Sequence, residues 1–380
     1  MKTTYLLLTA ASLAIVSPAL ANTAETSVQA AGAATKSADE DSVSTGVARA
    51  RDRLDSATST SSLKEGEIFK LAPRSLGEIF RNIPGMHAEA PGGEGNSNLT
   101  IRGLPLALGG AKFLQIQEDG LPTLEFGDIA FGTADNFLRA DLNLAAVESI
   151  RGGSASTFAS NSPGGIINLI SKTGDVEGGA VEGTAGLDYG EYRMDFDYGA
   201  RITDTLRFHV GGFYRQGEGP RHAGFDAFKG GQVKFNVTKD FSGGYIRIYG
   251  KYLDDRTPSY DTYPLAVSGT NAKPKFSSLP GFDIRDDSLL TRNFTSNVVL
   301  GANNTLERHA MSDGIHAKVS SLGLETQFAL GDWTVLEKAR FSKNSGRFMS
   351  TRLLSAVTPA VAGAQAQANS LAGAGAVLRY

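Results

Sequence analysis

The chain has 380 residues, of which 41% are hydrophobic and 20% charged. Its 37 basic and 40 acidic side chains leave a formal net charge of −3, which gives no basic surface for nucleic acid. The absence of cysteine excludes disulfide bonds and thiolate metal sites, while 45 glycines and no long apolar run after the N-terminus favour a β-rich protein.

The N-terminus has the pattern of a secretory signal peptide. Lys2 provides a positive start, Tyr5 to Val16 form an apolar core, and Ala19-Leu20-Ala21 is a small-residue cleavage site. A membrane-spanning helix would need about 20 apolar residues, and Pro18 interrupts the run. We therefore expect export and cleavage after Ala21.

Residues 22–66 are rich in Ala, Ser, Thr, Asp and Glu and contain few large apolar side chains. Such a segment cannot bury enough surface to fold, so a disordered tail is expected. From residue 67 to residue 174 the apolar residues become dense and irregularly spaced, and glycines interrupt them. This change predicts a folded α+β domain, after which residues 175–380 have a different pattern.

A short helix is predicted near the start of the α+β domain. Ser75 and Glu78 form a capping-box pattern, and Pro84-Gly85 ends the helix. Its buried stripe is predicted to be Ile79, Phe80 and Ile83.

Four sequence landmarks follow in a fixed order. They are Asn82-Ile83-Pro84-Gly85, Leu99-Thr100-Ile101-Arg102-Gly103, Gln117-Glu118-Asp119-Gly120 and the stretch from Asn143 to Lys172, which contains Arg151-Gly152-Gly153 and Pro163-Gly164-Gly165. In type, spacing and order they closely resemble the plug domain of TonB-dependent outer-membrane receptors. A run of about thirty matching residues is far more specific than a short motif.

After Gly174 apolar and polar residues alternate, which is typical of strands with two different faces. A phase slip at Ser320-Ser321 predicts a bulge in the sixth strand. The predicted strands are Val181 to Tyr189, Tyr192 to Tyr198, Leu206 to Tyr214, Val233 to Val237, Ile246 to Tyr252, Ile315 to Leu330 and Val335 to Phe341, with an eighth beginning at Val377 to Tyr380.

Either a half-solvated soluble sheet or a lipid-facing barrel would produce this alternation. Every second connection is a tight turn, at Thr203-Asp204, Asp240 to Gly244 and Gly331-Asp332, whereas residues 217–228 and 254–312 form long connections. This asymmetry favours an antiparallel transmembrane β-barrel. A charge facing lipid at mid-depth costs about 2 to 4 kcal/mol, so three basic residues are predicted to point into the lumen: Arg207, Lys234 and Arg247.

The resemblance implies a receptor in the outer membrane that imports a scarce nutrient, such as a ferric siderophore, a vitamin or a glycan fragment. Its partners would be the TonB energising complex of the inner membrane, outer-membrane lipid and a small nutrient ligand. The family has 22 barrel strands, and seven or eight strands cannot close around a plug. We therefore expect a truncated chain with an incomplete barrel that does not insert as a stable receptor by itself. The alternative is a non-transporting fragment that acts only as a binding module or is inactive.

The resemblance also implies functional residues. Arg102 and Arg151 would pair with barrel glutamates and lock the plug. The tail residues Asp41, Ser42, Val43, Ser44 and Thr45 would pair with TonB, although a spacer with no binding role explains this short motif equally well. On the external loops, the candidates for ligand contact are Arg221, His222, Tyr260 and Tyr263.

No catalytic pattern is evident. The five histidines are not spaced by three or four residues, and neither a nucleophile elbow nor a phosphate loop is present. Gly92-Gly93-Glu94-Gly95 follows no βαβ pattern and is interpreted as a loop. We therefore expect no enzyme activity, no cofactor and no metal site.

Overall fold

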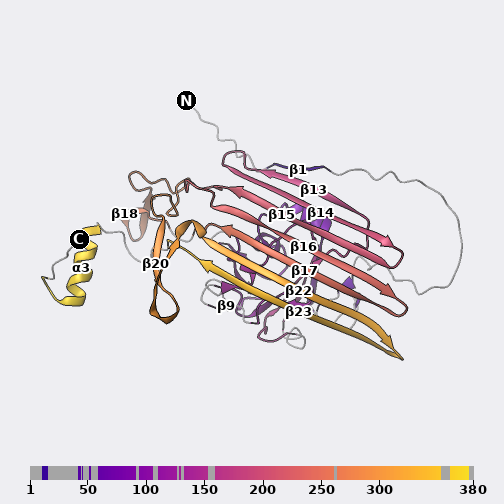
Figure 1. Cartoon of the computed structure of the whole chain (residues 1–380). Helices are drawn as coiled ribbons and strands as arrows, with labels where there is room; N and C mark the ends of the chain where they lie inside the picture. Colours follow the sequence, from indigo (N-terminus) through magenta and orange to yellow (C-terminus); the bar gives the residue numbers. More distant parts are fainter. Residues whose placement is uncertain are drawn as a thin grey trace.

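The computed structural model describes residues 11–15, 42–43, 45, 51–52, 59–90, 94–105, 110–125, 128–129, 132–152, 159–260, 263–351 and 360–375. They form an α+β domain that lies against one face of a large antiparallel sheet (Figure 1). Both parts of the fold class expected from the sequence are therefore present. Among these residues no helix is long and apolar enough to cross a membrane.

The α+β domain, called the plug below, is built on a mixed sheet in the order β4-β11-β12-β7-β8. The pairing of β12 with β7 is parallel, and the other pairings are antiparallel. The strands are β4 (Ser59–Lys64), β7 (Leu114–Glu118), β8 (Leu121–Pro122), β11 (Leu144–Arg151) and β12 (Gly165–Ser171).

Smaller elements complete the plug. Two helices, α1 (Glu65–Leu71) and α2 (Leu76–Phe80), follow β4, and the helical turn η2 (Ala134–Phe137) precedes β11. Short hairpins pair β5 (Met86–Glu89) with β6 (Asn98–Ile101) and β9 (Asp128–Ile129) with β10 (Gly132–Thr133), and in the tail before the plug β2 (Ser42–Val43) pairs with β3 (Arg51–Asp52).

The helix predicted from the capping box is α2. Ser75 is its N-cap, and its hydroxyl accepts a hydrogen bond from the Glu78 amide. The Glu78 carboxylate caps the backbone amide of Arg74 rather than that of Ser75. Ile79, Phe80 and Ile83 are almost fully buried in the plug core, as predicted.

The plug begins earlier than residue 67, where the sequence placed its start. β4 pairs with β11 over six residues, so Ser59–Lys64 is part of the plug sheet. Its composition, Ser-Thr-Ser-Ser-Leu-Lys, is that of a spacer. Backbone pairing holds this strand, and side-chain hydrophobicity therefore gave no signal of it.

The large sheet, called the wall below, is antiparallel throughout. Its strands are β13 (Gly178–Ala185), β14 (Glu191–Thr203), β15 (Leu206–Gly217), β16 (Phe228–Phe241), β17 (Gly244–Thr257), β22 (Ile315–Leu330) and β23 (Trp333–Phe348). β1 (Ala11–Ile15), inside the expected signal peptide, pairs with β13. Within the described residues β13 and β23 do not pair with each other, so the wall is an open sheet.

The two ends of the wall differ. At the turn end, two-residue turns join β14 to β15, β16 to β17 and β22 to β23. At the loop end the connection from β17 to β22 contains two hairpins and two helical turns (Figure 1). These are β18 (Ala266–Thr270) with β19 (Lys273–Ser277), β20 (Ser296–Leu300) with β21 (Leu306–Ala310), η4 (Ala302–Asn304) and η5 (Met311–Asp313).

The C-terminal part of the described chain is helical, as α3 (Ala360–Ala372). The eighth strand expected at residues 377–380 lies outside the described residues.

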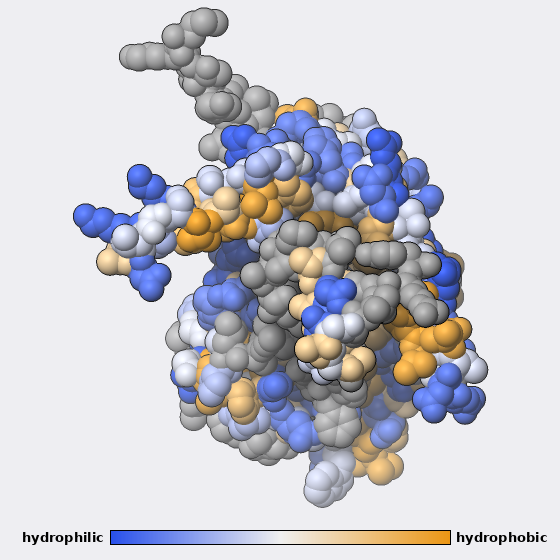
Figure 2. All heavy atoms as spheres, turned by 90° about the vertical axis from the view of Figure 1, so that its left-hand side faces the viewer, coloured by the Kyte–Doolittle hydropathy of each residue, from blue (hydrophilic) through white to orange (hydrophobic). Residues whose placement is uncertain are grey.

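Apolar side chains of the wall face outward. Hydrophobic residues lie in patches on the outer rim when the molecule is viewed from the loop end (Figure 2). On β14 the exposed residues are Tyr192, Met194, Phe196 and Tyr198, and the alternate positions are acidic or basic and turned inward. The face that contacts the plug is therefore the polar one.

The bulge predicted at Ser320-Ser321 is absent. β22 keeps one register with both neighbours through these residues. Hydrophobicity changes face there for another reason: Ala317 and Val319 face inward and pack near Phe137 of the plug, whereas Leu322 faces outward. A change of partner, and not an inserted residue, produces the phase slip.

Candidate functional site

The interface between plug and wall is built from charged groups, in two clusters. The first lies toward the loop end, where Arg139 follows η2 in the plug and Asp255 stands near the end of β17. Arg139 Nε lies 2.6 Å from Asp255 Oδ2, and Arg215 Nη2 on β15 lies 2.7 Å from the same oxygen. The Asp255 carboxylate is fully buried. One wall carboxylate therefore joins a plug arginine to a wall arginine.

The same cluster extends to a second plug loop. Arg215 also forms an ion pair with Glu94 of the plug, and Thr257 donates a hydrogen bond to the Glu94 backbone carbonyl. Arg74, before α2, lies 2.8 Å from Glu191 at the start of β14. These contacts hold the plug to β14, β15 and β17 through charges of both signs.

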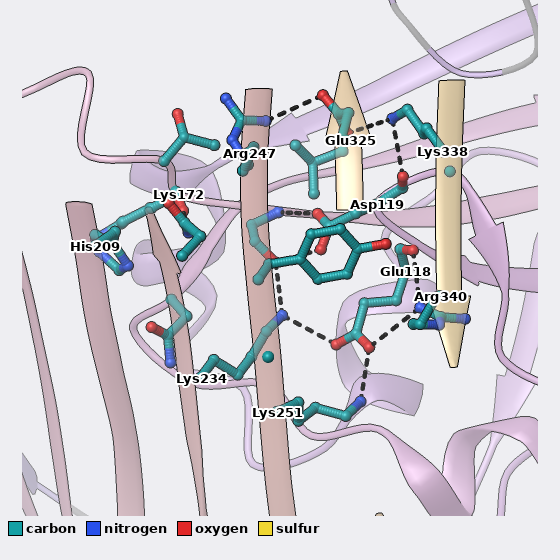
Figure 3. A pocket seen from close by; sticks show the side chains of 18 of the residues that line it. Glu118, Asp119, Lys172, His209, Lys234, Arg247, Lys251, Glu325, Lys338 and Arg340 are labelled. Atoms are coloured by element: carbon teal, nitrogen blue, oxygen red, sulfur yellow. Dashed lines mark hydrogen bonds and ion pairs between the residues drawn. The ribbon is translucent and has the colours of Figure 1, made fainter. Parts of the chain in front are cut away.

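The second cluster lies nearer the turn end and centres on Glu118, the last residue of β7 (Figure 3). Its carboxylate forms ion pairs with Lys234 Nζ of β16 at 2.9 Å and with Lys251 Nζ of β17 at 2.7 Å. Arg340 Nη1 of β23 lies 3.7 Å away and donates to the backbone carbonyl of Glu118. Three wall cations thus surround one plug carboxylate.

This surrounding fixes the protonation state of Glu118. Burial alone would raise the pKa of its carboxyl, but the charges of Lys234 and Lys251 outweigh that effect and hold the pKa well below its usual range. Glu118 is therefore ionised at neutral pH and at moderately acidic pH.

A cavity of about 720 Å³ lies beside Glu118, between the plug and the inner face of the wall (Figure 3). We call it the chamber. The plug lines it with Gln117 to Gly120 and Ser171 to Thr173, and the wall lines it with residues from β15, β16, β17, β22 and β23. Lys338 Nζ reaches the backbone carbonyl of Asp119 at 2.9 Å.

A second acidic group, Glu325 of β22, lies on the wall side of the chamber. It pairs with Arg247 at 3.1 Å and with Lys338 at 3.0 Å, and it accepts a hydrogen bond from the Tyr245 hydroxyl. Lys234 and Arg247, two of the three basic residues predicted to face the lumen, therefore both line the chamber. The third, Arg207, is buried and pairs with Asp175 and Asp240 nearer the turn end.

The tail contributes Thr45 to the chamber lining. The Thr45 amide and hydroxyl donate to Glu148 Oε2 of β11 at 2.8 and 2.5 Å, and the Asn168 amide donates to the Thr45 hydroxyl at 3.0 Å. Thr45 and Glu148 are both buried. Of the other residues expected to pair with TonB, Ser42 and Val43 form β2, and Asp41 and Ser44 lie outside the described residues.

Arg102 and Arg151 lie together on the plug, and both are close to Gly85. Arg151 donates to Ser59 Oγ and to the carbonyls of Thr60 and Pro84, all plug atoms. Arg102 is exposed, with a left-handed φ of 52°. The ion pairs that join plug to wall among the described residues are made by other side chains, so the locking role of these two arginines stays a prediction.

Three of the four loop candidates gather at the loop end. The Arg221 guanidinium lies 4.1 Å from the Tyr263 ring centroid and 5.7 Å from that of Tyr260, and it donates to the carbonyl of Ile284. The buried Tyr260 hydroxyl has no hydrogen-bond partner among the described residues. His222 is exposed, 3.7 Å from Glu218. Arg221, Tyr260 and Tyr263 thus form one cluster, and His222 stands beside it.

Sequence reasoning missed the residues that make the interface. Arg139, Asp255 and Glu118 were not candidates, because their partners lie more than one hundred positions away in the sequence. A signal was available in the wall strands, where charged residues recur on the inward face. Among the described residues, no group of three or more His, Asp or Glu side chains is placed to hold a metal ion.

Comparison with known proteins matches residues 52–166 to the TonB-dependent receptor plug domain. The ferric enterobactin receptor of Pseudomonas aeruginosa is 27% identical over 207 residues, which cover 49% of this chain and 26% of that receptor.

Solved structures share the fold at low identity. The ferric yersiniabactin uptake receptor FyuA of Yersinia pestis has a TM-score of 0.54 at 17% identity, covering 77% of this chain and 42% of that one. The siderophore receptor PirA of Acinetobacter baumannii has a TM-score of 0.51 at 16% identity, covering 77% and 41%. The chain thus spans less than half the length of these proteins.

Proposed function

We propose that the chain is a TonB-dependent receptor that serves the energised import of a ferric siderophore across a bacterial outer membrane, a proposal supported by the match of its plug domain and by the fold of its wall. The observation that carries this proposal is the plug held by ion pairs against the polar face of a sheet whose other face is apolar. In a closed barrel a plug in that position would fill the bore, so passage would require the plug to move. The siderophore class is drawn from the names of the similar receptors.

In this proposal residues 1–21 direct export and are removed. Residues 22–58 form the periplasmic tail, and Asp41 to Thr45 are the segment that TonB engages by adding a strand. Thr45 supports a link between that segment and the plug, because it bonds to Glu148 inside the plug sheet and also lines the chamber. Tension on the tail would withdraw Thr45 and leave the buried Glu148 carboxylate with fewer donors.

On the opposite side, the cluster of Arg221, Tyr260 and Tyr263 is proposed to meet the ligand at the loop end. Its cation and two phenol rings suit an anionic, aromatic-rich complex. Arg102 and Arg151 are proposed to lock the plug by pairing with glutamates of the barrel.

The test is uptake in iron-starved cells that lack their own siderophore receptors and express this chain. With a panel of radiolabelled ferric siderophores, we expect saturable uptake of at least one, abolished by deleting TonB. Val43→Pro should also abolish uptake, because proline cannot donate to an added strand. Thr35→Pro, elsewhere in the tail, is the matched control and should transport normally. Uptake that persists without TonB would contradict the proposal.

A second candidate function is binding without transport. The observation that favours it is the open wall, because β13 and β23 are not joined in the described part of the chain. Unsatisfied strand edges are strongly unfavourable within lipid. The same uptake experiment separates the two functions: surface binding of a ferric siderophore that is never internalised in TonB-positive cells would select this one.

A further inference from the structure

The chamber carries more positive than negative charge. Five cationic side chains of the wall line it, and the acidic side chains that line it are Glu118, Asp119 and Glu325. The wall cations are Lys234, Arg247, Lys251, Lys338 and Arg340. A sixth cation in the lining, Lys172, is already neutralised by Glu65 and Asp197.

The imbalance is greatest at Glu118. Lys234 and Lys251 both point at its single carboxylate, and Arg340 lies on the other side of Glu118 (Figure 3). The Asp119 carboxylate, which accepts from the backbone amide and hydroxyl of Ser171, adds a second negative charge near Lys234. Buried cations require anionic partners, since the desolvation of an uncompensated charge is expensive. Two carboxylates beside three cations therefore leave the group with an excess of positive charge next to an open space.

Two residues of the chamber lining also carry buried hydrogen-bond acceptors that have no partner among the described atoms. Asn143 and Asn236 belong to the chamber lining. Their side-chain carbonyl oxygens are buried and have no hydrogen-bond partner among the described atoms. Such acceptors suit a ligand with hydroxyl or amide donors. The volume of about 720 Å³ is within the usual range for sites that hold a small molecule.

From these observations we propose that the chamber is a binding site for a multiply charged anion that also carries hydroxyl or amide groups. This deepens the proposed function and rests on it in one respect: the anion would be the imported complex, halted on its way past the plug. The chamber lies toward the turn end, so a ligand arriving at the loop end reaches it after the plug has moved. Lys234 and Lys251 then release Glu118 and pair with the anion instead.

The experiment uses the full chain in detergent micelles and citrate as the probe, because citrate combines three carboxylates with a hydroxyl. Isothermal titration at low salt should detect binding to the unaltered chain, weakened by added salt. Lys251→Gln should weaken binding about ten- to hundredfold, since it removes a charged hydrogen-bond donor. Lys343→Gln, an exposed lysine on β23, is the matched control and should bind as the unaltered chain does.

Glu118→Gln gives the decisive contrast. It removes the resident anion, so citrate should bind about tenfold more tightly or better, a change that a merely structural carboxylate would not produce. Near-ultraviolet circular dichroism monitors folding. If Lys251→Gln unfolds, Lys338→Gln replaces it, because Glu325 keeps Arg247 as a partner there.

Unchanged affinity in the lysine variant, or no gain in Glu118→Gln, would overturn the proposal. If citrate binding follows the expected pattern but no siderophore is taken up, the proposed function is contradicted and the anion site is still supported.

Discussion

The plug and the wall bury opposite kinds of side chain. In the plug, apolar residues such as Ile79 and Phe80 are fully buried. In the wall, Phe196 and Ile248 are exposed while Asp255 and Lys251 are buried. Both parts follow one rule, which is that each side chain faces the medium that suits it. The plug folds around a hydrophobic core, whereas the wall turns its apolar face outward and its charges toward the plug.

The plug core should be the most sensitive to truncation. Phe80→Ala removes a fully buried ring and is expected to lower the free energy of unfolding of the plug by about 3 to 5 kcal/mol. Denaturant unfolding of the chain in micelles measures this. Phe276→Ala, on the exposed hairpin strand β19, should change stability little. Equal losses at the two positions would break the contrast between core and surface.

The interface should be nearly as sensitive to the loss of a charge. Asp255→Ala leaves Arg139 and Arg215 without their shared carboxylate in a buried site, so we expect a loss of about 3 to 5 kcal/mol. Limited proteolysis should at the same time cut the plug more readily. Asp283→Ala, in an exposed loop where it pairs with Arg285, serves as the control. A stable Asp255→Ala protein would mean that these charges do not hold the plug.

The outer face of the wall should reject charge. Phe196→Arg places a guanidinium at the middle of β14 on the apolar face and should cost about 2 to 4 kcal/mol in a bilayer. Unfolding from lipid vesicles is the appropriate measurement, and Phe276→Arg on the loop hairpin is the matched control. Indifference to arginine at both sites would show that β14 does not face lipid.

The pH dependence of docking should be the smallest effect. Because the folded-state pKa of Glu118 is lowered from its ordinary value of 4.5, its contribution to stability is present above about pH 4.5 and declines as the pH falls further. We expect a loss of about 1 to 3 kcal/mol of unfolding free energy at strongly acidic pH. The Glu118→Gln protein should show a smaller decline over the same range. Identical pH profiles for the two proteins would contradict the assignment of this pH dependence to Glu118.

Local sequence patterns predicted much of this fold, because local physics decides those features. The alternation on β14 predicted a strand with two faces, and the paired glycines helped to identify the plug. Both patterns depend only on residues that are close together in the sequence. The strand β4 escaped detection since its stability comes from backbone pairing with β11. At Ser320-Ser321 alternation misled, because the inward face of β22 changes from contact with Phe137 to the chamber, and hydrophobicity follows the partner.

The candidate site was harder to predict than the fold. Glu118 lay within a motif used to identify the plug, but its partners Lys234 and Lys251 are supplied by strands more than one hundred residues later. Arg207, Lys234 and Arg247 could be assigned to the inner face, since lipid excludes charge. The pairing of Lys234 with Glu118 depends on how the plug is seated on the wall, which no local pattern encodes, whereas Arg207 and Arg247 pair with carboxylates of neighbouring wall strands.

The most direct test of the docked plug is a double-mutant cycle between Arg139 in the plug and Asp255 in the wall. Unfolding free energies of the unaltered chain, Arg139→Ala, Asp255→Ala and the double variant give the coupling energy. Direct contact at 2.6 Å in a buried site predicts a coupling of about 1.5 kcal/mol or more. Additive losses, with no coupling, would contradict a plug seated on the polar face of the wall.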